Sequence, residues 1–173
     1  MSDQKKPRRK KFVPLKPMRL ATSTYKLPGA YAITICTKKR KKLFNIPALR
    51  SILYEEWTNL PQHFPGIVAG TFMVMHDHLH CILILKQGIE QEKSVRQIIG
   101  GYKSIVANAW LRHLSATGAN YPGDIWQSRF YDHIIRDEAD FKAQTAYILN
   151  NPRVYKAKQS KARKNKDKGQ KNV

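Results

Sequence analysis

Three histidines stand at alternate positions, His76, His78 and His80, just before a run of apolar and β-branched residues in the segment MVMHDHLHCILIL. Side chains two apart in a β-strand share a face, so His78 and His80 are expected on one face, with Leu79 and Cys81 on the other. Two imidazoles placed in this way could offer ring nitrogens to one divalent cation. Because most such pairs are only hydrogen-bonded, a metal site also needs a ligand from elsewhere in the chain.

A second group of polar side chains follows helical spacing near the end of the chain. Tyr147 and Asn151 are four residues apart, so they share one face of a helix, and Asp140 and Gln144 extend that face. A tyrosine in such a place is often half-buried with its hydroxyl in water, which leaves its role open at this point. A separate stripe is suited to packing against a sheet: Phe141, Thr145 and Ile148.

Composition indicates one domain that binds a polyanion. The chain has 173 residues, 42% of them hydrophobic, and a formal net charge of +20 from 32 Lys and Arg against 12 Asp and Glu. Nucleic acid is the favoured partner, because each neutralised phosphate releases counterions. A membrane partner is not expected, since the chain has no basic amphipathic helix and no run of about 18 apolar residues. Cys36 and Cys81 are expected to be buried free thiols, which fits a cytoplasmic, nucleoid-associated protein.

The two ends of the chain are distinguished by their charge. Residues 1–13 and 153–173 are rich in Lys and poor in apolar residues, so we expect two disordered basic arms around a folded domain at 14–152. Such arms either provide solubility and non-specific attraction or contact nucleic acid specifically, and both readings stay open.

Between the arms, the periodicity predicts an α+β fold. The expected elements are a strand at 31–37, a helix from Pro47 that stops at Pro61, strands at 66–74 and 78–85, a helix capped by Ser94, a strand at 129–136, and a last helix capped by Asp137 and ended by Pro152. The order βαββαβ is typical of a ferredoxin-like antiparallel sheet with helices on one face. The additional C-terminal helix carries Tyr147.

Three motifs occur in the order HLH at 78–80, IWQSRFYDHIIRD at 125–137 and YILNNP at 147–152. In this combination the chain resembles the REP-associated tyrosine transposases, which belong to the single-strand-specific HUH transposases with one catalytic tyrosine. The resemblance covers about residues 28–156. It implies metal-dependent cleavage and rejoining of single-stranded DNA at hairpin, REP-like palindromic sequences.

The resemblance also implies roles for individual residues. His78 and His80 match the pair that binds Mg²⁺ or Mn²⁺, and Asn151 matches the residue that completes the metal shell. Tyr147 matches the nucleophile, which forms a 5′-phosphotyrosine and leaves a free 3′-hydroxyl. His76 departs from the pattern, because the turn before the pair usually contains a proline, and it is not assigned to the metal.

Several basic and aromatic residues are candidates for DNA contacts. The basic run after the first strand could follow a phosphate backbone, as could two further cations: Lys38, Lys39, Arg40, Lys41 and Lys42, with Lys103 and Arg129. Aromatic side chains could stack on unpaired bases, although core packing is the more common role: Tyr25, Tyr31, Tyr102, Phe130 and Tyr131. Trp126, Gln127 and His133 are assigned to structure or DNA contact and not to catalysis.

Other functions remain to be weighed. A non-catalytic nucleic-acid-binding protein with a ferredoxin-like fold is the main alternative, although no segment matches the aromatic pattern of such RNA-binding domains. A ribosome-associated basic protein would explain the arms but not the histidine pair or Tyr147. A structural zinc site lacks cysteines at ligand spacing. The sequence leaves open whether the protein is a monomer or a homodimer.

Overall fold

The computed structural model describes residues 26–89 and 92–152. The two predicted arms at 1–13 and 153–173, and also Tyr25, lie outside the described residues, so the expectations for them stay predictions.

Four antiparallel strands form one sheet in the order β2-β3-β1-β4. This is the predicted α+β arrangement, and the ferredoxin-like order of elements is confirmed. The two central strands are β1 and β3, and β4 is an edge strand that begins three residues earlier than expected. The bounds are Gly29–Thr37 for β1, Ile67–Val74 for β2, His78–Leu85 for β3 and Trp126–Ile135 for β4.

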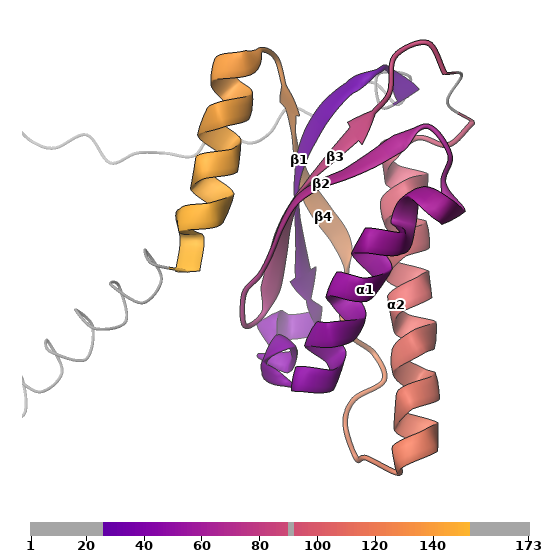
Figure 1. The fold of residues 1–173 in the computed structure, drawn as a ribbon. Helices are drawn as coiled ribbons and strands as arrows, with labels where there is room; N and C mark the ends of the chain where they lie inside the picture. The colour runs from indigo at the N-terminus through magenta and orange to yellow at the C-terminus, as the bar shows by residue number, and fades with distance from the viewer. Residues whose placement is uncertain (1–25, 90–91, 153–173) are drawn as a thin grey trace, which may run out of the picture.

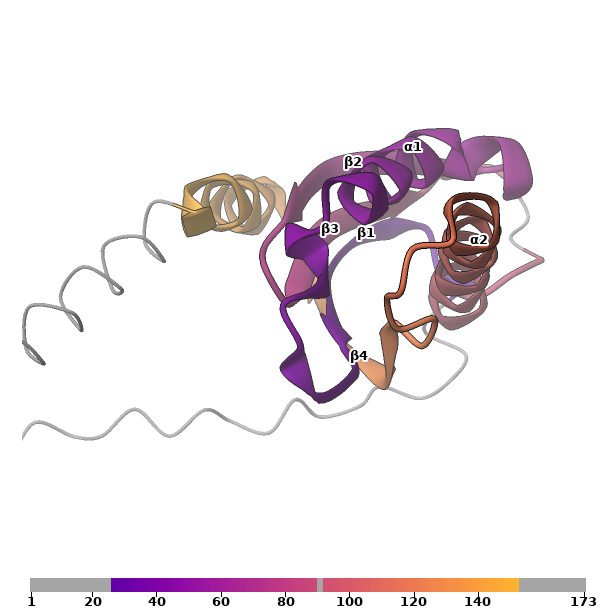
Figure 2. The ribbon, with the colours of Figure 1, turned by 90° about the horizontal axis from the view of Figure 1, so that it is seen from below.

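The helices lie on both sides of this sheet (Figures 1 and 2). Helices α1, Pro47–His63, and α2, Val95–Thr117, cover one face together, as predicted. Residues 138–152 form a further helix, drawn in orange and without a label, which we call the C-terminal helix. It lies against the opposite face, where it packs on the sheet through Ile148.

Strand alternation explains why the two faces differ. In β1, Tyr31, Ile33 and Ile35 are almost fully buried in a large core beneath α1 and α2. The intervening Ala32 and Thr34 face the C-terminal helix, where a small cluster forms around three buried isoleucines. These are Ile82, Ile135 and Ile148. The stability of the domain therefore comes mainly from the face covered by α1 and α2, and the opposite face is left for polar side chains.

The helix ends confirm some predictions and correct others. Ser94 caps α2 with a reciprocal bond to Gln97, as expected. Helix α1 does not stop at Pro61 but continues to His63, because a proline in the last turn removes only its own N–H bond while Phe64 still donates to Leu60. The C-terminal helix extends past Asn150, its expected last residue, and includes Asn151 and Pro152, where the described residues end.

The segment between β1 and α1 brings the basic run beside the β2–β3 turn. It forms the short helices η2, Lys38–Arg40, and η3, Leu43–Asn45. The hydroxyl of Thr37 donates to the carbonyl of Asp77 at 3.0 Å and to that of Lys41 at 2.7 Å, which ties this segment to the turn. Lys39 and Arg40 both have positive φ angles, 55° and 54°.

Close packing between the two core helices gives a test of this arrangement. A methyl group at Gly101 would lie 2.4 Å from the ring of Phe64, whereas one at Gly100 would meet nothing within 4 Å. Gly100→Ala should therefore raise the free energy of unfolding by about 1 kcal/mol through helix propensity. Gly101→Ala should be less stable than Gly100→Ala by at least about 1 kcal/mol, because Phe64 must move out of its contact. Urea denaturation measures both, and equal stabilities would contradict this packing.

Candidate active site

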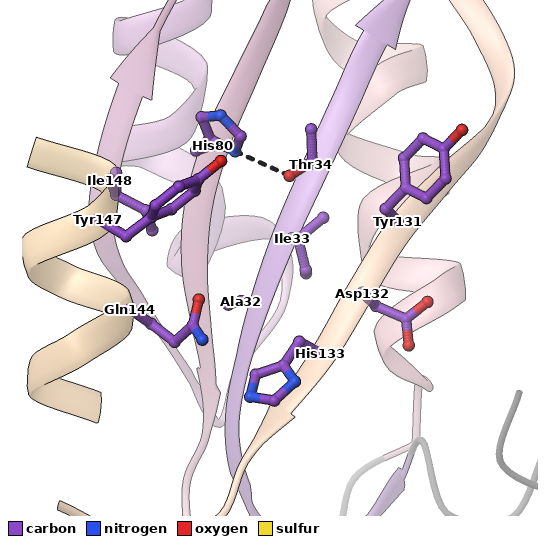
Figure 3. Close-up of a pocket in the computed structure, with 10 residues that line it drawn as sticks. All are labelled: Ala32, Ile33, Thr34, His80, Tyr131, Asp132, His133, Gln144, Tyr147 and Ile148. Atoms are coloured by element: carbon purple, nitrogen blue, oxygen red, sulfur yellow. Dashed lines mark hydrogen bonds between the residues drawn. The ribbon is translucent and has the colours of Figure 1, made fainter. Parts of the chain in front are cut away.

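The face of the sheet opposite α1 and α2, which we call the open face, carries a group of polar side chains. His80 is at the centre of this group. It is only 6% exposed, and both ring nitrogens have partners (Figure 3 shows one of them): Nδ1 lies 2.8 Å from the hydroxyl of Thr34, and Nε2 lies 3.1 Å from the amide nitrogen of Asn151. Because the Asn151 amide donates to Nε2, the ring proton is on Nδ1 and the hydroxyl of Thr34 accepts it. Burial, with the charges of His78 and Arg40, lowers the pKa of His80 to about 4. The imidazole is therefore neutral near pH 7.

His78 is held in place by a carboxylate. Its Nδ1 donates to Asp77 at 2.6 Å, and the other oxygen of Asp77 accepts from Arg40 Nε at 3.0 Å. Arg40 also contacts the sulfur of Cys36 through its Nη1 at 2.8 Å. The rings of His78 and His80 lie edge to face with centroids 4.8 Å apart, on one face of β3 as the alternation predicts.

The C-terminal helix brings Tyr147 and Asn151 to this pair. The ring of Tyr147 lies edge to face with that of His80 at 5.6 Å between centroids, and Tyr147 is 59% exposed. Four residues separate the two positions, so one face of the helix presents both side chains to His80. In Figure 3, Tyr147 extends from this helix toward His80 and Thr34.

A polar cluster fixes the start of this helix against β4. Asp140 accepts from His133 Nε2 at 2.8 Å and from the side-chain amide of Gln144 at 3.2 Å. The hydrogen bond from His133 is the main reason that the pKa of Asp140 is lowered. Asp137 accepts from the backbone N–H of Asp140 at 2.8 Å, which confirms it as the helix cap.

The donor set on this face fits a divalent cation. Both imidazoles have Nδ1 tied to an oxygen, His78 to Asp77 and His80 to Thr34, which is how outer partners orient metal-binding histidines through the other nitrogen. The amide of Asn151 can turn to present its oxygen beside Nε2 of His80. Among residues 26–89 and 92–152, no cluster of three His, Cys, Asp or Glu side chains is placed to hold a metal. A cation here would therefore depend on the two imidazoles and the amide.

The predicted basic run lies beside the histidine pair, but only one of its residues contacts a side chain of that site. Lys39, Lys41 and Lys42 are exposed, and Arg40 reaches Asp77. Lys38 forms an ion pair with Asp124.

The structure does not bring Lys103 to the histidine pair. Its ammonium donates to the backbone carbonyls of Gln127 at 2.6 Å and Ser128 at 3.2 Å, and burial lowers its pKa. Arg129 is exposed on β4, in the segment between Trp126 and Phe130 where the pairing with β1 is irregular.

The aromatic candidates separate into core and surface groups. Tyr31 and Tyr102 are buried in the core, and Phe130 packs against it. Trp126 donates its indole N–H to the carbonyl of Lys103 at 2.9 Å, which gives it a structural role. Tyr131 alone of the five stacking candidates is exposed among the described residues, and it lies on the open face.

Comparison with known proteins identifies the family and the fold. Residues 27–151 match the family described as "Transposase IS200 like". An uncharacterized protein from Haemophilus influenzae is 29% identical over 168 residues, which cover 82% of this chain and 90% of that protein. A solved structure described as a REP-associated tyrosine transposase bound to a REP hairpin shares the fold, with a TM-score of 0.55 and 21% identity over 82% of this chain and 74% of its own.

The chain therefore belongs to the IS200-like transposases, and the predicted family is confirmed. The class is that of DNA-binding transposases with a ferredoxin-like sheet. Among the described residues, no helix is both long and apolar enough to cross a membrane.

Sequence reasoning missed two residues of this site, Thr34 and Asp77. Thr34 is paired with His80 across β1 and β3, a register that one strand alone cannot reveal. Asp77 precedes His78 directly, so its position was visible, but its contact with the ring depends on the turn. The polar residue in an otherwise apolar strand was the available signal for Thr34.

The buried neutral state of His80 predicts an acid-sensitive fold. Between pH 6.5 and about 4 the unfolded chain binds a proton on this ring and the folded chain does not, so the free energy of unfolding falls as the pH is lowered. His80→Gln should reduce the stability difference between pH 7 and pH 5 by roughly 1–2 kcal/mol. Urea denaturation of both proteins in metal-free buffer measures it, and identical pH dependence would show that His80 does not titrate in this way.

Proposed function

We propose that this transposase cleaves and rejoins single-stranded DNA at hairpin sequences, through a covalent 5′-phosphotyrosine on Tyr147. A divalent cation, Mg²⁺ or Mn²⁺, would be held by His78, His80 and Asn151. The alternative is a nucleic-acid-binding protein of the same fold without chemistry.

One observation carries this proposal. Tyr147 and Asn151, from the C-terminal helix, both meet His80, which lies on the sheet 67 and 71 positions earlier in the chain. Contact between an exposed phenol and a histidine pair with oriented rings is not needed for packing, because the core lies on the other face.

The proposed chemistry is a transesterification. The phenolic oxygen of Tyr147 forms a bond to the scissile phosphorus and loses its proton, while the bond from phosphorus to the 3′-oxygen breaks. The 3′-oxygen takes up a proton and leaves as a hydroxyl, and the phosphate stays on the tyrosine. Because the new ester keeps the energy of the broken bond, a 3′-hydroxyl can later attack it without ATP.

The residues around the phenol have distinct tasks in this scheme. Asp77 and Thr34 hold the two imidazoles through Nδ1, and Asn151, whose amide nitrogen donates to Nε2 of His80, would turn its oxygen inward to complete the donor set for a cation. A bound divalent ion supplies charge neutralisation at the phosphate oxygens. The C-terminal helix positions Tyr147 for in-line attack.

Single-stranded DNA fits the surroundings better than a duplex. The phosphate must reach histidines on the sheet face beside the C-terminal helix, and a flexible single strand follows such a surface more readily than a rigid duplex. The exposed Lys39, Lys41 and Lys42, next to the β2–β3 turn, offer phosphate contacts, as does Arg129 on β4. Hairpin recognition is proposed from the family and from the fold shared with the hairpin-bound transposase.

The nucleophile can be tested by a single-atom change. Tyr147→Phe should lower formation of the covalent protein–DNA adduct by roughly a thousandfold or more, because the attacking oxygen is gone, while DNA affinity is retained. The assay is denaturing gel electrophoresis of labelled hairpin DNA with Mn²⁺. Tyr131→Phe is the matched control, since Tyr131 is exposed to the same degree in the same region and should still form the adduct. Unchanged adduct formation in Tyr147→Phe would exclude Tyr147 as the nucleophile.

The cation site can be tested by direct binding. Asp77→Ala should weaken Mn²⁺ binding by about 10–100-fold, because His78 loses the partner that orients its ring. Asp77→Asn should recover most of the affinity, since it keeps an acceptor oxygen. Asp124→Asn, an exposed acid paired with Lys38, is the control and should have no effect. Isothermal titration calorimetry gives the affinities.

Removal of both imidazoles is the strongest test of the cation site. His78→Ala with His80→Ala should abolish Mn²⁺ binding and cleavage but leave DNA affinity nearly unchanged, since phosphate contacts dominate it. Full Mn²⁺ affinity in the double variant would place the cation elsewhere.

A further inference from the structure

A pocket opens directly beside Tyr147, between the C-terminal helix and strands β1 and β4. Its volume is about 130 Å³, below the roughly 300–1,000 Å³ of sites for drug-sized ligands, so it suits one small planar group. Ala32 and Thr34 of β1 line its floor, and their small side chains leave the space open. Figure 3 shows Tyr147 and Gln144 on one side of this space, with Tyr131 and His133 on β4 at the other.

Tyr131 gives this pocket an aromatic wall. It is 58% exposed, whereas Tyr31 and Tyr102 are buried in the core. An exposed tyrosine on an open strand face contributes no core packing, but it offers a surface on which an unpaired base can stack. Tyr131 on β4 is opposite Thr34 on β1, and Thr34 is in turn opposite His80 on β3.

Asp140 determines which hydrogen-bonding groups remain for a ligand. A carboxylate only accepts, so the amide nitrogen of Gln144 must face Asp140, which leaves the Gln144 oxygen as an acceptor. For the same reason Nε2 of His133 carries a proton in its bond to Asp140. Within the part of the chain that the structure describes, no side chain donates to the Gln144 oxygen. The pocket therefore offers an acceptor to its ligand.

The charge next to the pocket disfavours a phosphate as its occupant. The carboxylate of Asp140 lies behind Gln144 and His133, whereas Asp132 alternates with Tyr131 and His133 and directs its carboxylate away from the pocket. A phosphate placed there would be repelled, while a neutral base would not. The pocket and the histidine pair thus suit different parts of one nucleotide.

We propose that this pocket binds a single unpaired nucleobase with an exocyclic amino group, next to the phosphate that Tyr147 attacks. The base stacks on Tyr131, and its amino group donates to the oxygen of Gln144. This inference rests on the proposed function, because it takes single-stranded DNA as the substrate. It adds a preference for cytosine, adenine or guanine over thymine at this position.

The test measures binding without chemistry. Full-length protein is titrated, in metal-free buffer, into fluorescent oligo(dC), oligo(dT) and an abasic strand of equal phosphate count, each of about 12 nucleotides. The parent should bind oligo(dC) more tightly than oligo(dT), and the abasic strand most weakly. Tyr131→Ala should weaken oligo(dC) binding at least about fivefold and leave abasic binding unchanged, because only the base contact is lost.

Matched variants separate stacking from general charge. Tyr131→Phe keeps the ring and should bind oligo(dC) as the parent does. Tyr121→Ala removes a tyrosine of similar exposure that does not line the pocket, and it should have no effect. Gln144→Leu keeps the size of the side chain but removes the acceptor, and should abolish the preference for oligo(dC) over oligo(dT).

Two results would overturn the pocket assignment. One is equal binding of the abasic strand and oligo(dC) by the parent, and the other is an equal loss on both strands in Tyr131→Ala. Neither result bears on adduct formation by Tyr147, and failure of the adduct assay leaves the binding comparison intact. The two proposals therefore fail separately.

Discussion

The arrangement of the candidate active site depends on how one buried imidazole is satisfied. His80 lies on a central strand with little exposure, where an unpaired ring nitrogen would be costly. Thr34 on the neighbouring strand binds one nitrogen and Asn151 on the C-terminal helix binds the other. The same contacts that neutralise this cost also connect the sheet to the helix. Since Tyr147 is four residues before Asn151, the position of the phenol follows from the hydrogen bond of the amide.

The two faces of the sheet divide stability from chemistry. Most buried apolar side chains lie under α1 and α2, whereas three isoleucines are buried on the face of the C-terminal helix. Burial of an aliphatic side chain contributes about 1.5–3 kcal/mol, so this helix is held by much less apolar contact than α1 and α2. The pair of His133 and Asp140 adds a polar contact at its start. In the proposed reaction, a DNA strand would thus approach the histidines without disturbing the main core.

The basic segment after β1 combines attraction with alignment. Arg40 is part of a run that gives this end of the sheet its positive charge, yet its guanidinium also holds Asp77, which in turn holds His78. The positive φ angles of Lys39 and Arg40 belong to the tight path that brings Arg40 back over Cys36. Such angles are uncommon for residues other than glycine, and the contacts of Arg40 offset their cost. Changes in this run would therefore affect the geometry of the site as well as its charge.

Several features of this protein could be predicted from local periodicity alone. Alternation placed His78 and His80 on one face of a strand, and helical spacing placed Tyr147 and Asn151 on one face of a helix. The order of elements and the cap at Ser94 also followed from local patterns. These inferences held because neighbours in sequence have fixed relative directions in a strand or helix.

Which distant groups meet depends on how the strands pair and the helices pack. Thr34 reaches His80 because β1 pairs with β3 in one register, and Lys103, expected at DNA, is bound to the carbonyls of Gln127 and Ser128 because α2 crosses the start of β4. The acceptors that face the pocket depend on Asp140, whose contacts join a strand and a helix. Strand register and helix docking are set by the packing of the whole core, and no short segment of sequence contains that information.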